Sequence, residues 1–283
     1  MGVYVVTGAA SGMGRAAAEK LRERGHTVVG VDLRDAQVVA DLSTPAGRRT
    51  AIDGVLAQVD GHLDGAILAA GVGPAPGADR PRLIFEVNYR GVVDLLDGWR
   101  SALARADEAK VVVFGSNSTT TTPLVPRRAI RALLAGDTEK ALRALRIFGR
   151  NAPSIAYGTS KIAVSHWVRR QATTAQWAGA GIRLNALAPG AVLTPLLEKQ
   201  LATAAEAKNI ERFPVPIGGF GDPGDLAEWA VFMLSPAARF LCGSIVFVDG
   251  GSDAYFRAGD WPRAVPLRKL PGYLWRFFGS GPR

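Results

Sequence analysis

A tyrosine and a lysine four residues apart, Tyr157 and Lys161, are the side chains in this sequence best placed to move a proton. A helix over residues 157–177 would put the pair on one face, one turn apart. A free tyrosine hydroxyl has a pKa near about 10, and a neighbouring ammonium favours the phenolate and lowers that pKa. The pair could exchange a proton with an alcohol or carbonyl oxygen. Taken alone, Tyr157 could equally be a half-buried packing residue.

A glycine-rich turn stands between the first predicted strand, residues 3–6, and a predicted helix that stops at Gly25. Its three glycines, Gly8, Gly12 and Gly14, have the spacing GxxxGxG. Glycines let the backbone turn sharply and approach a dinucleotide pyrophosphate, which then lies at the helix N-terminus. An ordinary glycine turn is the alternative, but a strand and a helix flank this one on the correct sides. The loop therefore predicts a dinucleotide site.

Asp32 ends the second predicted strand, residues 27–31, about 20 residues past the glycine loop. A carboxylate there accepts hydrogen bonds from both hydroxyls of a ribose diol and would repel a 2′-phosphate. The residue between the last two glycines is Met13 and not a basic residue. Arg34 lies nearby and keeps NADP open as the alternative. The sequence favours NAD over NADP.

Strand and helix patterns alternate along the rest of the chain. The further strands are predicted at residues 38–40, 65–69, 110–114, 182–187 and 244–248. The further helices are predicted at residues 45–59, 83–106, 157–177, 196–208 and 222–234. This alternation predicts an α/β fold, a doubly wound parallel seven-stranded sheet of Rossmann-like type with helices on both faces. Asn88 falls in the middle of a predicted helix, where solvent exposure is its simplest explanation.

The chain has 283 residues, of which 48% are hydrophobic. That length suits one domain, expected over residues 1–251, followed by a basic aromatic extension, residues 252–283. No apolar run is long enough to span a membrane, and no secretory signal opens the chain. Cys242 is the only cysteine, so a cytoplasmic location is expected. No metal site is expected, because the histidines are not spaced as ligands: His26, His62 and His166.

The net charge of +9 is not spread evenly. Residues 117–156 carry 7 basic and 2 acidic side chains, and residues 252–283 carry 6 and 2. The remaining residues are balanced overall. Because the charge is confined to one internal segment and one tail, the sequence does not indicate a nucleic-acid-binding protein.

The separate signals stand in one order: glycine loop, Asp32, Ala70-Gly71, Asn88, Ser116, Tyr157-x-x-x-Lys161 and Pro189-Gly190. In this order they resemble the short-chain dehydrogenase/reductase family, over about residues 1–251. The resemblance implies four catalytic residues: Asn88, Ser116, Tyr157 and Lys161. It also implies a set of cofactor-binding residues: Gly8, Ser11, Gly12, Met13 and Gly14 at the pyrophosphate, Asp32 at the adenosine ribose, Asp41 and Leu42 at the adenine, Ala70 and Gly71 on the ribose side, Tyr157 and Lys161 at the nicotinamide ribose, and Pro189, Gly190, Val192 and Thr194 at the nicotinamide.

The resemblance assigns a role to each catalytic residue. Tyr157 is the general acid/base, and Lys161 lowers its pKa and holds the nicotinamide ribose. Ser116, rather than Ser118, donates a hydrogen bond to the substrate oxygen, because it follows the fifth strand after Gly115. Asn88 holds a water molecule of the proton relay.

One departure from the family is large: 40 residues, 117–156, separate the serine from the tyrosine, where most members have about a dozen. Two short Arg-rich amphipathic patterns, residues 127–134 and 137–147, predict a helical insertion. The insertion resembles that of the bacterial 3α-hydroxysteroid dehydrogenase/carbonyl reductase branch, as do residues 28–44 and 183–191. The substrate is therefore expected to be a 3-hydroxysteroid, with an aryl alcohol of the coniferyl type as the alternative. A non-catalytic nucleotide sensor is the alternative from another class.

Apolar residues follow the Pro189-Gly190 turn and suit the cover of an apolar alcohol or ketone, or packing against the insertion: Leu193, Leu196, Leu197, Leu201, Ile210, Phe213, Pro214 and Pro216. The extension mixes basic residues with aromatic ones: Tyr255, Phe256, Trp261, Tyr273, Trp275, Phe277 and Phe278. Docking of the extension on the same or a partner subunit is favoured, with contact to a membrane surface as the alternative. The family resemblance implies a homodimer or homotetramer.

Overall fold

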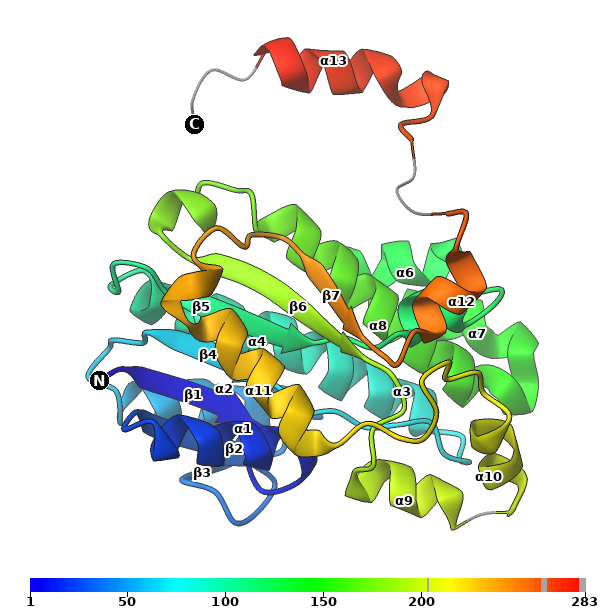
Figure 1. Cartoon of the computed structure of the whole chain (residues 1–283), viewed down its shortest axis with the longest axis horizontal. Coiled ribbons are helices and arrows are strands. Elements are labelled where there is room, and N and C mark those ends of the chain that lie inside the picture. The colour runs from blue at the N-terminus through cyan, green and yellow to red at the C-terminus, as the bar shows by residue number, and fades with distance from the viewer. Residues whose placement is uncertain (203, 261–263, 280–283) are drawn as a thin grey trace.

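The computed structural model describes residues 1–202, 204–260 and 264–279. Seven strands form one sheet in the order β3-β2-β1-β4-β5-β6-β7, and every pair of neighbours is parallel. Their bounds are β1 Val3–Thr7, β2 Thr27–Asp32, β3 Val38–Val39, β4 Gly65–Leu68, β5 Lys110–Phe114, β6 Arg183–Pro189 and β7 Ile245–Val248. The predicted fold class is confirmed (Figure 1).

Helices cover both faces of the sheet. The longer ones are α1 Gly12–Glu23, α2 Pro45–Leu56, α4 Gly91–Leu103, α8 Ala152–Gln171 and α11 Pro223–Leu234. The shorter ones are α3 Arg80–Phe85, α5 Ser118–Thr121, α6 Arg127–Leu134, α7 Thr138–Leu145, α9 Pro195–Leu201, α10 Ala204–Glu211, α12 Ser252–Arg257 and α13 Leu270–Gly279. One π-helical turn, η1 Glu86–Arg90, joins α3 to α4. The 3₁₀ turns are η2 Arg146–Asn151, η3 Ala178–Ala180, η4 Pro236–Ala238 and η5 Leu267–Lys269.

Strand β5 shows how the two layers of helices are specified. Successive side chains of a strand point to opposite faces of a sheet. Val111 and Val113 join the core under α2, α4 and α8, whereas Val112 and Phe114 join the core under α1 and α11. All five residues of β5 are buried. A run of apolar residues without polar alternation is what a strand covered on both faces requires.

The carboxyl ends of the parallel strands lie at one edge of the sheet. The strand order reverses between β1 and β4, since β1 leads outward to β2 while β4 leads to β5. Ligands bind outside the carboxyl ends of the strands at such a reversal. Many of the predicted site residues lie at the ends of β1, β2, β4, β5 and β6 or in the loops that follow, and the topology brings these strand ends to one edge. The others, Asn88, Tyr157 and Lys161, lie on helices.

The predicted helix over residues 83–106 is confirmed as one unbroken helical run over residues 80–103, but it contains a π-helical turn that the sequence did not predict. The structure has α3, the π-helical turn η1 and then α4. A π turn inserts one extra residue into a helix and is frequent at functional sites. Asn88 lies in this turn and is only 1% exposed, so solvent exposure does not explain it. The predicted helix over residues 157–177 also differs, because α8 begins at Ala152 and ends at Gln171.

The predicted helix over residues 196–208 consists of α9 and α10, and Thr203 between them lies outside the described residues. In the insertion, α6 has the bounds predicted from the sequence. The second insertion helix is shorter than residues 137–147, because α7 ends at Leu145 and continues as η2. Gly149 has a φ of 48° inside η2, a conformation that breaks a regular helix.

The insertion is packed into the body of the protein. Its buried residues include Ile130, Leu133 and Leu145, which belong to the core that also contains α8. Helix α6 packs on both α7 and α8. Asp137 begins α7, and its side-chain Oδ1 accepts a hydrogen bond of 2.8 Å from the Lys140 N–H. The apolar faces of both amphipathic patterns are therefore covered, and their arginines face outward.

The extension divides into two parts. Helix α12 packs on α5, and the Ser252 hydroxyl donates to the Pro214 carbonyl at 2.7 Å, so this part is docked on the chain's own body. Helix α13 lies away from the sheet and its helices in Figure 1. Trp261 of the predicted aromatic set lies outside the described residues. None of the helices in the described part of the chain is long and apolar enough to cross a bilayer.

Candidate active site

The glycine loop is held by contacts that exclude any side chain. A Cβ built on Gly14 would lie 2.2 Å from the Gly8 carbonyl oxygen, and one on Gly8 would lie 2.9 Å from the Ala70 nitrogen. Gly8 and Gly12 have φ values of 72° and 54°, which glycine adopts without strain. Ser11 is the N-cap of α1, is exposed, and its hydroxyl makes no capping hydrogen bond. Free N–H groups at a helix start and an unused hydroxyl suit a pyrophosphate.

Asp32 ties the end of β2 to this loop. Its Oδ2 accepts a hydrogen bond of 2.9 Å from the Ala10 N–H, and its Oδ1 accepts one of 2.7 Å from the Leu33 N–H. These bonds fix the carboxylate beside the loop. Each carboxylate oxygen keeps a further lone pair for a hydroxyl of a ribose diol.

Ser116 is positioned by the pairing of β5 with β6 beyond the strand ends. The Gly115 N–H donates to the Leu187 carbonyl at 2.7 Å, and the Asn117 N–H donates to the Pro189 carbonyl at 2.8 Å. Ser116 stands between these two bonds and is buried. Its side chain acts on the Tyr157 hydroxyl and lowers the pKa of that tyrosine. The sequence preferred Ser116 to Ser118, and in the structure Ser116 is the serine that meets Tyr157.

Lys161 lies beneath the tyrosine. Its Nζ donates to the Phe114 carbonyl at the end of β5 at 2.8 Å and lies 5.8 Å from the centre of the Tyr157 ring. A Cβ on Gly71 would lie 3.9 Å from the same Nζ. The predicted one-turn spacing on α8 therefore brings Tyr157 and Lys161 to the ends of β4 and β5. The two residues meet there with Ser116.

The expected lowering of the tyrosine pKa is not what the structure shows. Burial raises the pKa of Tyr157, and the side chain of Ser116 opposes that shift. Burial also lowers the pKa of Lys161 to about 8. The reason is common to both groups, because surroundings with little water penalise the charged form of each. At neutral pH the pair consists of a neutral phenol and an ammonium that is close to losing its proton.

Asn88 fastens the loop after β4. Its Oδ1 accepts a hydrogen bond of 2.8 Å from the Val72 N–H, and its Nδ2 donates to the Val72 carbonyl at 2.9 Å. A Cβ on Gly71 would lie 3.3 Å from Asn88 Oδ1. The side chain of Asn88 therefore holds residues 71–73 next to Lys161. Its expected role in binding a water molecule of the relay stays a prediction.

The loop after β6 closes the site from the other side. A Cβ on Gly190 would lie 2.7 Å from Asp249 Cα, so this glycine allows a close backbone contact. The loop continues through Val192 to Thr194, whose Oγ1 caps α9 by accepting from the Leu197 N–H at 3.4 Å. A Cβ on Gly12 would lie 3.5 Å from the methyl group of Thr194. The predicted pyrophosphate and nicotinamide loops thus face each other.

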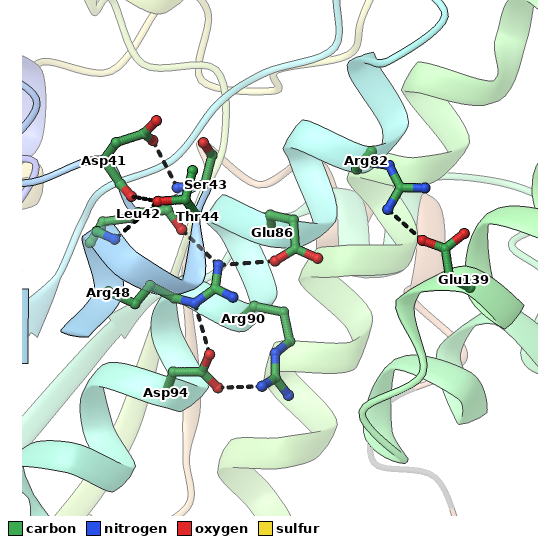
Figure 2. Close-up of polar contacts among 11 residues, drawn as sticks. Asp41, Leu42, Ser43, Thr44, Arg48, Arg82, Glu86, Arg90, Asp94 and Glu139 are labelled. Atoms are coloured by element: carbon green, nitrogen blue, oxygen red, sulfur yellow. Dashed lines mark hydrogen bonds and ion pairs between the residues drawn. The ribbon is translucent and has the colours of Figure 1, made fainter.

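Arg48 holds Leu42 of the predicted adenine-side pair, Asp41 and Leu42, and it was not foreseen from the sequence (Figure 2). Its side chain is 4% exposed, and Nη1 donates to the Leu42 carbonyl at 2.9 Å. Nη1 also lies 2.9 Å from a Glu86 oxygen, and Nε lies 2.8 Å from an Asp94 oxygen. Arg48 therefore connects the adenine-side turn to the helix that carries Asn88. An arginine within an amphipathic helix gives no signal of this kind in the sequence.

Thr7 is a second residue that the sequence did not single out. It is 1% exposed, and its Oγ1 accepts a hydrogen bond of 3.1 Å from the Ala70 N–H. This bond joins the end of β1 to Ala70, which the family resemblance places on the ribose side of the cofactor. The only sequence signal is its position, immediately before Gly8.

A cavity of about 290 Å³ lies between the loop after β4 and the end of the insertion. Its lining is formed by Pro76, Gly77, Ala78, Pro81, Gly149, Arg150, Ala152 and Pro153. Pro153, which lines this cavity, is one turn before Tyr157 on α8. Most of its lining residues are apolar, and Arg150 is the one charged residue among them.

A family model and several known proteins match this chain. Residues 140–253 match a family model described as enoyl-(acyl carrier protein) reductase. The chain is 37% identical to the 3-alpha-hydroxysteroid dehydrogenase/carbonyl reductase of Comamonas testosteroni, over 91% of this chain and 98% of that protein. The chain belongs to the short-chain dehydrogenase/reductase family.

Two further proteins that match this chain are named as dehydrogenases. The chain is 32% identical to the coniferyl-alcohol dehydrogenase of Pseudomonas sp. (strain HR199 / DSM 7063), over 87% of this chain and 94% of that protein. The crystal structure of the 3-alpha-hydroxysteroid dehydrogenase from Pseudomonas sp. B-0831 complexed with NADH superposes with a TM-score of 0.85. That chain is 43% identical, and the match covers 92% of this chain and all of that one. These short-chain dehydrogenases confirm the family predicted from the sequence.

Proposed function

We propose that this short-chain dehydrogenase/reductase is an NAD(H)-dependent oxidoreductase that interconverts a secondary alcohol and a ketone on an apolar substrate, and that the substrate is a 3-hydroxysteroid. The observation that carries the chemistry is the meeting of three side chains at the ends of β4 and β5: Ser116 acts on the pKa of Tyr157, and the Lys161 Nζ lies 5.8 Å from the centre of the Tyr157 ring. Such a cluster near the glycine loop can serve a hydride-transfer reaction by handling the proton.

NAD fits the residues of the glycine loop and of the end of β2. The glycine loop leaves no room for a Cβ at Gly14, Ser11 has an unused hydroxyl at the start of α1, and Asp32 presents a carboxylate at the ribose position. NAD, when bound, supplies the acceptor or donor of the hydride. The NADH complex of a relative that is 43% identical supports NAD over NADP.

The chain's own residues then manage the oxygen of the substrate. Tyr157 gives its proton to a ketone oxygen in reduction and takes one from an alcohol in oxidation. Ser116 hydrogen-bonds the same oxygen and stabilises the negative charge that develops on it. We assign Asn88 to the proton relay, because it lies next to Lys161 through Gly71.

The substrate side supports an apolar molecule. The cavity of about 290 Å³ is lined mainly by apolar residues. Leu193 of the loop after β6 and Leu196 of α9 are both partly exposed and add further apolar surface. Two of the relatives are named for steroid substrates and one for coniferyl alcohol. An aryl alcohol is therefore the second candidate substrate.

A substrate panel tests the proposal. Purified full-length protein is incubated with 3α-hydroxysteroids, 3β-hydroxysteroids and coniferyl alcohol, each with NAD and with NADP, and NADH or NADPH formation is followed by absorbance. We expect turnover of a 3-hydroxysteroid with NAD, and a loss of about 10²–10⁴-fold in Tyr157→Phe. Turnover of coniferyl alcohol alone would contradict the steroid assignment. Equal turnover by Tyr157→Phe would contradict the mechanism.

We also propose that the chain forms a homodimer or homotetramer. Helix α6 of the insertion packs on α8, so this surface of α8 is covered within the chain. Helix α11 presents Trp229 and Phe232, which are 44% and 48% exposed and contact each other edge to face. Exposed paired aromatics of this kind suit a subunit interface. Analytical ultracentrifugation of the wild type and of Trp229→Ser/Phe232→Ser tests the assembly, and a monomeric wild type would contradict it.

A further inference from the structure

Helix α13 is an exposed helix with an apolar face. Leu270, Tyr273, Leu274 and Phe277 follow the spacing i, i+3, i+4, i+7 that gathers side chains on one side of a helix. Phe278 is 78% exposed and Trp275 is 67% exposed. Among the described residues, the substantial packing partner of α13 is η5, immediately before it. The body of the chain therefore leaves this apolar face uncovered.

The charge around α13 has one sign. After Asp260 the sequence contains five basic residues and no acidic residue. Arg268 and Lys269 lie in η5, directly before the helix, and Arg276 lies within it. An apolar helix face rich in Trp and Phe, combined with basic residues, is the composition of helices that lie in the plane of a lipid interface. Anionic headgroups would complement the basic residues.

The length of α13 excludes a spanning segment. The helix has 10 residues, about half of what a bilayer core requires. A helix this short is marginally stable alone in water, because its nucleation is unfavourable and its few backbone hydrogen bonds contribute little stabilisation. Burial of its apolar face against a surface would stabilise it. A helix that lies in the plane of a lipid interface needs no membrane-spanning length, and its apolar face is buried there.

A second copy of this chain fits α13 less well. Each copy carries a net charge of +9, and the tails would bring two uniformly basic segments together. Stable protein interfaces bury about 1,200–2,000 Å². One face of a 10-residue helix supplies only a small part of that area. An anionic lipid surface has no such repulsion and needs no shaped partner.

We propose that η5 and α13 dock the chain on the surface of an anionic lipid bilayer, with the apolar face of α13 in the interface and the basic residues at the headgroups. The docking does not depend on the identity of the substrate. Residues 261–266 separate η5 and α13 from the active-site body in the sequence. Docking therefore leaves the residues of the active site unchanged.

Vesicle sedimentation tests this docking with the full chain. The wild type is mixed with vesicles of phosphatidylcholine, with and without phosphatidylglycerol, at low and high salt. We expect binding to the anionic vesicles only, weakened by salt. Leu274→Ser/Phe277→Ser/Phe278→Ser should abolish it. Arg268→Gln/Lys269→Gln should lower the partition coefficient about 30-fold, at about tenfold per 1.4 kcal/mol, because each basic residue near an anionic surface contributes about 1 kcal/mol.

Phe240→Ser is the matched control, because Phe240 is an aromatic residue that is 100% exposed and lies outside the extension. It should bind vesicles like the wild type. Unchanged thermal unfolding of all variants shows that the body remains folded. Equal binding to neutral and anionic vesicles would overturn the proposal, as would unchanged binding of the triple Ser variant. Self-association that the triple Ser variant loses, without vesicle binding, would also overturn it and make a second copy the occupant.

Discussion

On the cofactor side of the site, backbone atoms approach one another within contact distance, whereas on the substrate side the elements meet through side chains. Gly14 packs on the Gly8 carbonyl, and Gly190 packs on the backbone of Asp249. The insertion instead packs through Ile130, Leu133 and Leu145, which could be exchanged for other apolar residues of similar volume. One side therefore demands particular residue types, and the other demands only a pattern.

The same contrast holds for charge. On the cofactor side, Arg48 is buried and contacts Glu86 and Asp94. On the substrate side, Arg82 pairs with Glu139 of the insertion at the surface, as Figure 2 shows. Removing one partner of a buried ion pair leaves a charge without compensation, while water solvates the remaining partner of a surface pair. The cofactor side should therefore tolerate substitution poorly, and the insertion should tolerate it well.

The largest effect is expected for Arg48→Met. The change leaves Glu86 without its ion-pair partner, Asp94 with Arg90 alone, and the Leu42 carbonyl without its donor. We expect a loss of about 3–5 kcal/mol in the free energy of unfolding and a higher KM for NAD. Chemical denaturation and steady-state kinetics measure these. Glu139→Gln is the matched change on the substrate side, and an equal loss of stability there would break the comparison.

Lys161→Met sharpens the comparison where the two sides meet. Lys161 has a pKa of about 8 in the folded protein against 10.5 for the free side chain, so between these values the unfolded chain binds more protons. The cost of burying the charge is present below pH 8 and disappears as the pH rises to 10.5.

The difference in unfolding free energy between Lys161→Met and the wild type should therefore fall with rising pH, by about 3 kcal/mol at most. Denaturation at several pH values measures this difference. The exposed insertion residue Lys140, changed to Met, should show no such trend. A difference for Lys161→Met that does not vary with pH would contradict the lowered pKa.

Gly14→Ala tests the close backbone contact. The new Cβ would lie 2.2 Å from the Gly8 carbonyl oxygen, so the glycine loop must shift. We expect about a 10²-fold loss in kcat/KM for NAD, since small displacements of a bound group have effects of that order. Gly91→Ala is the control, because its Cβ would meet its nearest neighbours at 3.5 Å, an ordinary contact. Similar kinetics of both variants would refute the steric explanation.

Asp32→Asn should give the smallest of these effects. The amide keeps one acceptor oxygen but loses the charge and one hydrogen bond to the loop or to a ribose hydroxyl. We expect about a tenfold loss in kcat/KM for NAD and a smaller loss for NADP. Asp35→Asn, at a neighbouring exposed carboxylate, should leave both values unchanged. An unchanged NAD-to-NADP ratio in Asp32→Asn would exclude the predicted ribose contact.

The cofactor side could be predicted from the sequence to a large extent. The apolar runs of β1, β4 and β5 indicate strands buried on both faces, and glycines at fixed spacing mark turns where no side chain fits. Tyr157 and Lys161 are linked by one helical turn, which is a local relation. The insertion helix α6 was also predicted with its observed bounds, because its apolar residues repeat with the period of a helix.

Other features depend on contacts between distant parts of the chain. The π-helical turn contains Asn88, whose side chain hydrogen-bonds the backbone of Val72 in the loop after β4. Arg48 is one arginine of an amphipathic pattern until Leu42, Glu86 and Asp94 are brought around it. The direction of the Tyr157 pKa shift also follows from burial, which no local pattern records.

By itself, the sequence determined the strands, the glycine loop and the Tyr157–Lys161 pair, because these depend on residues within a few positions of one another. The tertiary structure decided how Ser116 meets Tyr157, how Arg48 holds the adenine-side turn, and that α13 leaves its apolar face uncovered. Hydrogen bonds, ion pairs and burial between distant segments arise only when the sheet brings the strand ends to one edge. For that reason the helical spacing of Tyr157 and Lys161 could be predicted from the sequence alone, whereas their electrostatic environment could not.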